Sequence, residues 1–432
     1  MESIHIGLLG LGTIGSGVYK LLSNHREELE FQLGSKLVVD RILVNNLDKE
    51  RMVDGVNLDK SLFTSNAADI FKDPKIDIII EVIGGETLAK EYIVKALEAG
   101  KSVITANKDV LALHGVMLSK LARENECDIY YEASVGGGIP IIRSLTEGLA
   151  SDKITRIMGI VNGTTNYILT KMSKEGMSYE EALSMAQKLG FAEPDPTNDI
   201  EGYDAARKMV ILSSLAFSMP ITLEDVYTRG ISSVDIHDID FAANLGYTIK
   251  LIGYADLSDG KAEVSVQPTL LPDNHPMASV HNENNAVYLH GSAVGETMFY
   301  GPGAGAMPTA TAIVSDVISA VKRIKLNVSG RHIIDFRNER SIKGDSNIEA
   351  KFYLRLNVKD EVGVLNEISS VFANEQLSFE SVLQKPTDNP KDASLIIITH
   401  KVILENYIKA LRKLSQLDVV NCIESSYRVF SM

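Results

Sequence analysis

The chain has 432 residues, of which 45% are hydrophobic and 23% charged, and its formal net charge is -14 at pH 7. Because a single hydrophobic core stops growing near about 250 residues, this length predicts about three domains. The acidic balance argues against nucleic-acid and membrane-surface partners, since both attract basic patches and the sequence holds no block of Lys and Arg.

The cysteines and the N-terminal segment indicate the compartment. Cys127 and Cys422 are too few and too far apart for a disulfide framework or a zinc site, so we expect both to be buried small apolar residues. The first residues lack a basic stretch before an apolar core, and no apolar run approaches the length of a membrane span. We therefore expect a cytoplasmic protein.

A glycine motif follows the first predicted strand, residues 4–9. In the segment GLGTIG, Gly10, Gly12 and Gly15 have G-x-G-x-x-G spacing. The first glycine suits a tight turn, the second lets the backbone approach a pyrophosphate, and the third lets a helix pack on the strand. A helix from Thr13 then directs its N-terminal amides at the anion, which predicts a dinucleotide site.

Strands and helices alternate after this motif. We expect strands at 37–44, 76–82 and 102–105. One helix is expected at 87–99, and a second follows the strand at 102–105 and ends at 126. This alternation predicts a parallel, doubly wound sheet whose ligand lies beyond the carboxyl ends of the strands. Gly84, Gly85 and Lys108 follow such ends.

The end of the second predicted strand bears on cofactor preference. An acid at this position bonds the ribose hydroxyls, whereas a basic residue accepts a 2′-phosphate. Here stand Asn45 and Asn46, with Lys49 and Arg51 just beyond. We therefore expect NADP in preference to NAD, with NAD still open.

A second glycine run, ASVGGGIPII at 133–142, is incompatible with regular structure and leaves the carbonyls of Val135, Gly137 and Ile139 exposed. It allows two interpretations, a flexible hinge or a carbonyl cage for a monovalent cation. Backbone and carboxylate oxygens are the ligands that hard cations prefer.

Two stretches of the middle region point to a polar site. Asn162, Gly163 and Thr164 begin a helix with free amides, which suits a carboxylate. The stretch FAEPDPTNDIEGYDAARK, 191–208, is rich in acids and precedes a predicted buried helix from about Asp199 to Ser218. Its Asp204 and Lys208 share a face at i, i+4 spacing, either as a structural ion pair or as part of a pocket for a small zwitterion.

The remaining segments complete the domain organisation. Hairpins at 249–271 and 286–300 predict an antiparallel sheet, and the glycine loop 301–310 is either a plain crossover or a cofactor contact at Gly305. From residue 350 a βαββαβ order predicts a ferredoxin-like module. The fold is thus α/β, with a Rossmann-type domain at 1–150 completed by helix 309–323, an α+β domain with an antiparallel sheet at 151–308, a linker at 324–349 and a ferredoxin-like domain at 350–432.

The motifs GLGTIG, ITANKD, EASVGGGIPII, NGTTNYIL and FAEPDPTNDIEGYDAARK, in this order, closely resemble homoserine dehydrogenase over residues 4 to about 323. The segment DEVGVLNEI, 360–368, resembles the turn of an ACT domain, so the whole resembles the long, feedback-regulated form of that enzyme. The resemblance implies an NAD(P)-dependent oxidoreductase of threonine, methionine and isoleucine biosynthesis, acting reversibly between L-aspartate 4-semialdehyde and L-homoserine. It also implies that the domain at 151–308 binds the substrate and forms the dimer contact, and that the domain at 350–432 is regulatory, with inhibition by threonine near Gly363 to Leu365. The expected assembly is a homodimer or homotetramer.

Residue roles follow from the same resemblance. It implies a dinucleotide site of Gly10, Gly12, Thr13, Ile14, Gly15, Gly84, Lys108, Gly190, Glu193 and Gly305. It implies that the substrate is bound by Glu193, Asp199, Asp204 and Thr164. Lys208 is the expected acid–base residue. Lys108 either supplies a second positive charge or is itself the acid–base residue, with Lys208 supplying the second charge. A structural Na⁺ or K⁺ site is implied at Glu132, Val135, Gly137 and Ile139.

Two departures and two rival functions accompany this reading. Asn198 stands where the family often has an aspartate, which weakens the expected hold on an ammonium, and Asn45 where it often has an arginine.

Oxidation to an acyl phosphate needs an activated thiolate, which neither cysteine's setting provides. The alternative from another class is a non-catalytic nucleotide and amino-acid sensor, which would not require the two lysines beside the acids.

Overall fold

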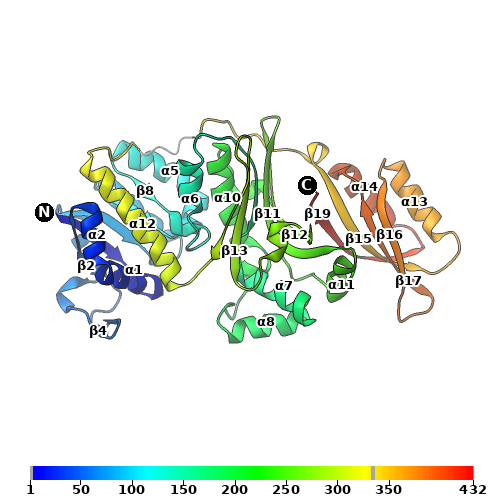
Figure 1. The fold of residues 1–432 in the computed structure, drawn as a ribbon, viewed down its shortest axis with the longest axis horizontal. Helices are drawn as coiled ribbons and strands as arrows, with labels where there is room; N and C mark the ends of the chain where they lie inside the picture. The colour runs from blue at the N-terminus through cyan, green and yellow to red at the C-terminus, as the bar shows by residue number, and fades with distance from the viewer. Residues whose placement is uncertain (1–2, 332–335, 432) are drawn as a thin grey trace. The chain divides into compact units, whose positions relative to one another are not determined.

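The computed structural model describes residues 3–331 and 336–431. The chain forms two compact units, the first from residues 1–155, 210–223 and 285–340, and the second from residues 156–209, 224–284 and 341–432 (Figure 1). Within the described ranges, no helix combines the length and apolar content that crossing a bilayer requires. Residues 332–335 of the expected linker lie outside the described residues.

The first unit contains a six-stranded sheet in the order β5-β2-β1-β6-β7-β8. Every pairing along it is parallel, which confirms the doubly wound prediction. The strands are β1 Ser3–Leu9, β2 Lys36–Leu43, β5 Phe63–Thr64, β6 Ile76–Glu81, β7 Ser102–Thr105 and β8 Ile129–Tyr130, beside a small hairpin of β3 Met52–Val53 and β4 Val56–Asn57. The order reverses at β1, so its end and that of β6 flank the crevice where ligands bind in such sheets.

The helices of the first unit are α1 Thr13–Asn24, α2 Arg26–Leu33, α3 Ala68–Phe71, α4 Thr87–Glu98, α5 Lys108–Glu124, α6 Ile141–Arg143 and α12 Ala306–Lys325. Helix α12 packs with the first helices of the chain, because α1, α2 and α12 share one buried core with the sheet (Figure 1). A Cβ on Gly17 would lie 2.9 Å from the carbonyl oxygen of Ala306, so a glycine is needed where α1 meets α12. This unit also holds the expected hairpin, β13 Asn284–Gly291 and β14 Gly295–Pro302.

The second unit is organised around a larger sheet whose strands run in the order β9-β11-β12-β19-β15-β17-β16. These strands are β9 Ile154–Ile160, β11 Tyr247–Ser258, β12 Lys261–Pro272, β19 Val420–Val429, β15 Glu349–Lys359, β17 Asp392–Thr399 and β16 Phe379–Pro386, with β10 Val226–Thr228 and β18 Val402–Ile403 at its side. Asp259 and Gly260 both have positive φ, 52° and 73°, as a two-residue turn between β11 and β12 requires. The helices of this part are α7 Gly163–Glu175, α8 Tyr179–Lys188, α9 Thr197–Ile200 and α11 Ile236–Asn244, together with the first half of α10 Tyr203–Phe217, which belongs to the first unit from Val210 onward.

The C-terminal module has the predicted βαββαβ order, with α13 Val364–Asn374 and α14 Leu404–Leu414 (Figure 1). Its core is separate, and in it the rings of Phe352 and Tyr407 stack with centroids 4.0 Å apart. Its sheet is nevertheless continuous with the middle sheet, because β19 pairs in parallel with β12 at Thr269↔Arg428 and Leu270↔Val429. The C-terminal module is thus joined to the middle sheet of the second unit by backbone hydrogen bonds.

Two expectations from the sequence are wrong. The single helix expected from Asp199 is broken into α9 and α10, because Gly202 takes a left-handed φ of 82° and a Cβ there would meet Val266 at 3.2 Å. Cys127 is buried as expected, but Cys422 is exposed. Cys422 falls on a solvent-facing position of β19, where its thiol lies 3.2 Å from the carboxylate of Glu424.

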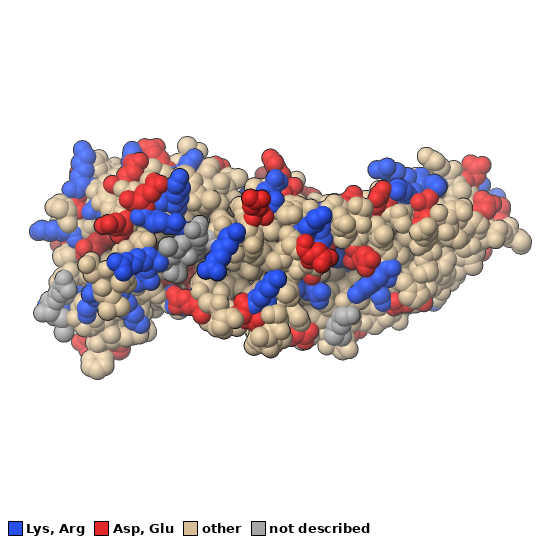
Figure 2. Space-filling model, turned by 90° about the horizontal axis from the view of Figure 1, so that it is seen from above, with Lys and Arg blue, Asp and Glu red and all other residues tan. Residues whose placement is uncertain are grey.

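Charged side chains are dispersed. On the face in Figure 2, Lys and Arg alternate with Asp and Glu, and no extended basic patch is seen among the described residues on that face. This agrees with the acidic net charge of -14.

Candidate functional site

The polar cluster of the second unit is built on the turn from β9 into α7. Asn162 caps α7, because its Oδ1 accepts a hydrogen bond from the Thr165 amide at 2.9 Å. The cap uses only the oxygen of this side chain, so its NH₂ group can donate to other acceptors. Its Nδ2 donates to Asp199 Oδ1 at 2.7 Å and to Asp204 Oδ2 at 2.8 Å, so one cap residue joins both acids.

Lys208 lies in the same cluster. Its Nζ donates to Asp204 Oδ2 at 2.7 Å and to the carbonyl oxygen of Val161 at 2.6 Å. The Lys208 and Asp204 side chains are only 13% and 9% exposed, so solvent screens their interaction weakly. The predicted i, i+4 relationship is therefore present and buried, with two fixed oxygens aiming the ammonium.

The second carboxylate oxygen of Asp199, Oδ2, faces Thr164. Thr164 donates its hydroxyl to the carbonyl oxygen of Phe191 at 2.6 Å and lies 3.3 Å from Asp199 Oδ2. Burial raises the pKa of Asp199, and the nearby charge of Asp204 acts in the same direction, while the hydrogen bond from Asn162 opposes them. With both carboxylates ionised and Lys208 protonated, the cluster carries one net negative charge, which favours an ammonium group as its ligand.

An anion-binding element adjoins these acids. The first residues of α7, Gly163 and Thr164, present amides that have no partner within the helix, at the positive end of its dipole. A Cβ on Gly163 would lie 2.6 Å from the carbonyl oxygen of Glu283, so only glycine lets the chain turn here. A helix start beside a pair of acids suits a molecule with both a carboxylate and an ammonium.

The fourth predicted substrate residue, Glu193, is joined to this cluster by no hydrogen bond among the described residues. Glu193 is exposed on the loop after α8, where its carbonyl oxygen accepts from Gln187 at 3.2 Å. Gly190, with φ 78°, begins this loop. Asn198 is exposed, and its Oδ1 lies 3.4 Å from Arg207, so its amide faces a basic partner.

The first unit contains a cavity of about 460 Å³ at the ends of β1, β2 and β6. A Cβ on Gly15 would lie 2.2 Å from the carbonyl oxygen of Gly10, which itself has φ 99°, whereas Gly12 has open space around it. These are the three conditions that a dinucleotide loop demands. Thr13 and Ile14 are the first two residues of α1. The cavity is lined by Gly10, Leu11, Gly12, Leu43, Val44, Asn45, Asn46, Lys49, Arg51, Ser65, Val82, Ile83, Gly84, Leu88 and Tyr92.

Lys108 is the first residue of α5 in this same unit. The preceding Asn107 caps the helix by accepting from the Val110 amide at 3.2 Å, and donates to the carbonyl oxygen of Gly85 at 2.6 Å. The cap thereby ties the Gly84 turn, which lines the cavity, to the helix that carries Lys108. Lys108 belongs to the first unit and Lys208 to the second.

The second glycine loop is buried. Residues 132–137 are all buried, and Gly136 and Gly137 take left-handed φ values of 73° and 56°. Both carboxylate oxygens of Glu132 accept backbone N–H groups, from Ile142 at 2.7 Å and Arg143 at 2.8 Å, so its carboxylate already has partners inside the protein. Buried loop carbonyls require partners, and oxygen atoms are the ligands that hard cations prefer. Gly305, φ 118°, caps α12 after the neighbouring loop, whose Gly303 packs on Gly137.

The bridging role of Asn162 is what sequence reasoning missed. The sequence predicts Asn162 as part of a helix start that suits a carboxylate, but not that its side chain binds both acids. The available signal is chemical, since an asparagine cap uses its oxygen on the helix and leaves two N–H donors. Those donors need acceptors when the residue is buried, and the acids lie 37 and 42 positions later in the chain.

Comparisons with known proteins agree with this architecture. The family model described as homoserine dehydrogenase matches residues 140–318, and the one described as its NAD binding domain matches residues 10–132. The ACT domain model matches residues 352–419. The matches follow the chain in the order of the expected domains.

Full-length relatives carry the same name. A homoserine dehydrogenase of Bacillus subtilis (strain 168) is 53% identical over 430 residues and spans 99% of both chains. The crystal structure of a homoserine dehydrogenase from Thiobacillus denitrificans is 38% identical, has a TM-score of 0.94, and covers 100% of this chain and 99% of its own. A hyperthermophilic archaeal homoserine dehydrogenase in complex with NADPH is 28% identical, has a TM-score of 0.62, and covers 74% of this chain and 98% of its own. With a relative this similar over both full lengths, the chain belongs to the homoserine dehydrogenase family of oxidoreductases, with a nicotinamide-cofactor domain and a C-terminal ACT domain.

Proposed function

We propose that the chain interconverts L-aspartate 4-semialdehyde and L-homoserine, with Lys208 as the residue that moves the proton. The observation that carries this proposal is the position of the Lys208 ammonium, held at 2.7 Å by Asp204 and at 2.6 Å by the Val161 carbonyl beside a second acid, Asp199. A structural ion pair alone does not require a second, partly buried acid or an adjoining helix start.

Each group of the substrate has a counterpart in the cluster. The ammonium suits Asp199 and Asp204, and the carboxylate suits the amides that begin α7 at Gly163 and Thr164. The aldehyde then extends toward Lys208. Because Asn162 holds both acids and caps the helix, it positions both ends of the substrate.

The nicotinamide, when bound, donates or accepts the hydride. As the aldehyde carbon is reduced, its oxygen gains negative charge, and the Lys208 ammonium stabilises that charge and donates a proton to the oxygen. In the reverse direction a neutral lysine accepts the hydroxyl proton. We assign Lys108 the role of a second positive charge from the cofactor-binding unit. In the alternative assignment, Lys108 moves the proton and Lys208 supplies the second positive charge.

We infer a preference for NADP over NAD. No carboxylate stands at Asn45 or Asn46, and the side chains of Lys49 and Arg51 line the same cavity. Arg51 also packs over the ring of Phe63 with its guanidinium 5.2 Å from the centroid, which holds it near the cavity. The archaeal relative with NADPH in its crystal structure supports the same preference. The glycines and helix start of the motif would hold the pyrophosphate.

Three further assignments complete the proposal. We propose that the carboxylate of Glu132 and the backbone oxygens of Val135, Gly137 and Ile139 hold a structural Na⁺ or K⁺. We propose threonine as an inhibitor, since the ACT domain fits regulation by an amino acid. We propose a homodimer or homotetramer that assembles through the antiparallel sheet and works in the cytoplasm.

The activity is tested with the purified full-length chain. NADPH oxidation is followed at 340 nm, about where the reduced nicotinamide absorbs, with L-aspartate 4-semialdehyde and either Na⁺ or K⁺ present. Turnover with the formation of L-homoserine is the expected result. Tight NADPH binding without turnover would instead support the non-catalytic sensor, an interpretation that the named relatives do not favour.

A further inference from the structure

Lys250 is a buried cation on β11, a strand on which helix α7 packs, and its side chain is only 1% exposed. Its ammonium donates to Oδ1 of Asn166 on α7 at 2.9 Å and to the carbonyl oxygen of Val280 at 2.6 Å. Both acceptors are neutral, and no carboxylate in the described part of the chain contacts this ammonium. Because a buried charge without a counter-charge is costly, its retention calls for a reason beyond packing.

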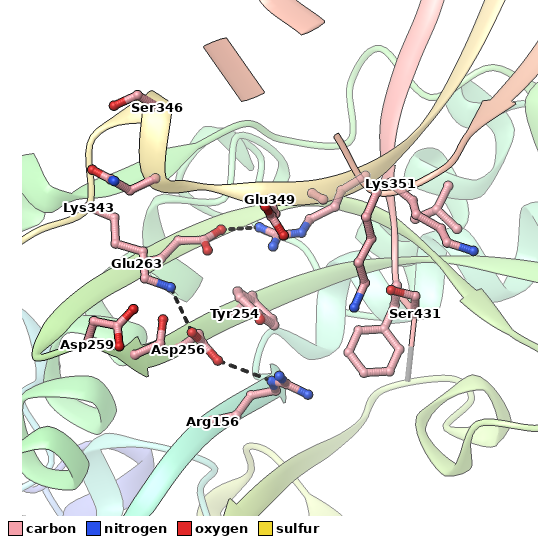
Figure 3. Close-up of a pocket in the computed structure, with 17 residues that line it drawn as sticks. Arg156, Tyr254, Asp256, Asp259, Glu263, Lys343, Ser346, Glu349, Lys351 and Ser431 are labelled. Carbon is pink, nitrogen blue, oxygen red and sulfur yellow. Dashed lines mark hydrogen bonds and ion pairs between the residues drawn. The ribbon is translucent and has the colours of Figure 1, made fainter. Parts of the chain in front are cut away.

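Cations elsewhere on the same strand are paired with an acid. In the polar cavity of Figure 3, Asp256 of β11 lies 2.8 Å from Lys343 and 3.4 Å from Arg156. The titratable groups that face Lys250 among the described residues are instead basic, namely Lys174 on α7 and His281. The positive charge of Lys250 is therefore not neutralised by its surroundings.

The side chain of Asn166 also holds the segment 280–284, which leads into β13, against α7. Its Nδ2 lies 2.8 Å from the carbonyl oxygen of Asn282, 3.2 Å from that of Asn284 and 3.3 Å from that of Val280. Lys250 and Asn166 share the Val280 oxygen, so one network joins β11, α7 and this segment.

The segment lies directly against the helix start that suits the substrate carboxylate. A Cβ on Gly163 would lie 2.6 Å from the carbonyl oxygen of Glu283. The Asn166 amide donates to the Asn162 carbonyl oxygen at 3.3 Å, and Asn166 is only about 4.5 Å further along the helix axis than Gly163. The Lys250 ammonium is thus near the positive end of the α7 dipole, where a cation is unfavourable until an anion binds.

We propose that Lys250 is a positioning residue for the substrate carboxylate, which holds the start of α7 through Asn166 and adds positive charge near its free amides. Because it is buried, Lys250 does not touch the substrate. The inference rests on the proposed function, since it takes the amides of Gly163 and Thr164 as the carboxylate site. It gives Lys250 no part in hydride or proton transfer, so its loss should weaken substrate binding.

The test compares two ligands that differ only in the carboxylate. L-homoserine has a carboxylate, an ammonium and a hydroxyl, whereas 3-amino-1-propanol lacks the carboxylate alone. Each is titrated calorimetrically into the full-length protein with NADPH, which does not oxidise an alcohol. At about pH 6 the Lys250 ammonium is charged, because burial lowers its pKa only to about 7.

Lys250→Met is expected to raise the dissociation constant of L-homoserine about tenfold and to leave that of 3-amino-1-propanol unchanged. This is the order of effect expected for one charge roughly 10 Å away at the effective dielectric of a protein. The matched control is Lys101→Met, because Lys101 is also buried, at 5% exposed, and its Nζ donates to two backbone carbonyl oxygens of the first unit. The control should leave both dissociation constants unchanged.

Asn166→Asp is a second variant that tests the same network without leaving the lysine unpaired. Its new carboxylate pairs with Lys250, which neutralises the charge, and it lacks the NH₂ donors to the segment 280–284. This variant should weaken binding of L-homoserine with the same selectivity.

Two results would overturn the assignment. One is equal weakening of both ligands by Lys250→Met, which would mean that the lysine supports the whole polar cluster without serving the carboxylate. The other is binding of L-homoserine that both variants leave unchanged. The titrations need no turnover, so a chain that binds with the expected selectivity but does not reduce L-aspartate 4-semialdehyde contradicts the proposed function alone.

Discussion

A single carboxylate oxygen, Asp204 Oδ2, accepts hydrogen bonds from Lys208 Nζ at 2.7 Å and from Asn162 Nδ2 at 2.8 Å. Because Asn162 also caps α7, this oxygen connects the proposed proton donor to the helix start that suits the substrate carboxylate. The ammonium of Lys208 and the amides of α7 are therefore held in one geometry before the substrate arrives, and organisation of this kind lowers the entropic cost of reaching the transition state.

The two functions of Asn162 are separable by substitution. Asn162→Ser keeps an N-cap but removes the donor to both acids, whereas Asn162→Ala removes the cap as well. We expect the serine variant to lose roughly 10- to 100-fold in kcat/KM, the effect of one hydrogen bond to a charged group. Steady-state kinetics measure this loss, and a serine variant with unchanged kcat/KM would show that the bridge to the acids has no catalytic role.

Cofactor preference should depend on Arg51. Arg51→Ala is expected to raise KM for NADPH about tenfold, as for the loss of one charge-assisted contact to phosphate, and to leave KM for NADH nearly unchanged. Lys60→Ala is the matched control, because Lys60 is an exposed cation of the same unit that does not line the cavity. Equal changes in both KM values would mean that Arg51 supports the pocket without reading a 2′-phosphate.

The ACT module should depend on Asp238 for stability. This fully buried carboxylate, on α11, accepts from Arg355 Nε at 2.6 Å, from Ser425 Oγ at 2.7 Å and from the hydroxyls of Tyr353 and Tyr427 at 2.9 and 3.0 Å. Asp238→Asn leaves Arg355 with Asp235, 3.5 Å away and largely exposed, as its counter-charge, and the loss of the buried partner is expected to cost about 3 kcal/mol of unfolding free energy.

Chemical denaturation of the full-length chain measures this cost. The control is Asp240→Asn, two residues along α11 and exposed. If both variants unfold at the same denaturant concentration as the unmodified chain, the carboxylate does not hold α11 to the ACT strands.

Lys250 should give unfolding a pH dependence. It is 1% exposed, and its Nζ donates to Asn166 Oδ1 at 2.9 Å and to the Val280 carbonyl at 2.6 Å, neither of which is an acid. Burial, with a smaller contribution from Lys174, lowers its pKa to about 7. In the unfolded chain this lysine has an ordinary pKa of about 10.4, so the unfolded chain binds the proton more tightly than the native chain. The free energy of unfolding therefore rises with pH between the native and the unfolded pKa of Lys250.

Substitution of Lys250 isolates its contribution. The rise has a maximum slope of about 1.4 kcal/mol per pH unit for one proton, and Lys250→Met should flatten it between about pH 7 and 9. Unfolding free energies at these two pH values provide the measurement, with Lys261→Met as the exposed control. An identical pH dependence in Lys250→Met and the unmodified chain would contradict a depressed lysine pKa.

Local signals explain which parts of the fold could be predicted. The glycine motif, the Asp259-Gly260 turn and the βαββαβ order each depend on residues close in sequence, and the structure confirms all three. Asp204 and Lys208 were also predictable as a pair, because helical spacing alone puts them on one face.

Long-range contacts explain the rest. The pairing of β12 with β19 joins residues about 160 positions apart, such as Thr269 and Arg428, and no local pattern specifies that partner. The break at Gly202 follows from close packing against Val266, and the role of Asn162 follows from acids on α9 and α10. The apolar pattern of α10 predicted burial correctly but carried no information on where the helix begins.

The central claim is that Lys208 transfers the proton. Single-turnover reduction of L-aspartate 4-semialdehyde by the Lys208→Ala enzyme, preloaded with NADPH, measures that step, with Lys188→Ala, an exposed lysine at the end of α8, as the control. We expect Lys208→Ala to slow the reaction by about two to four orders of magnitude, while the NADPH dissociation constant stays unchanged. A Lys208→Ala enzyme that reduces the aldehyde at the rate of the unmodified chain would contradict the account.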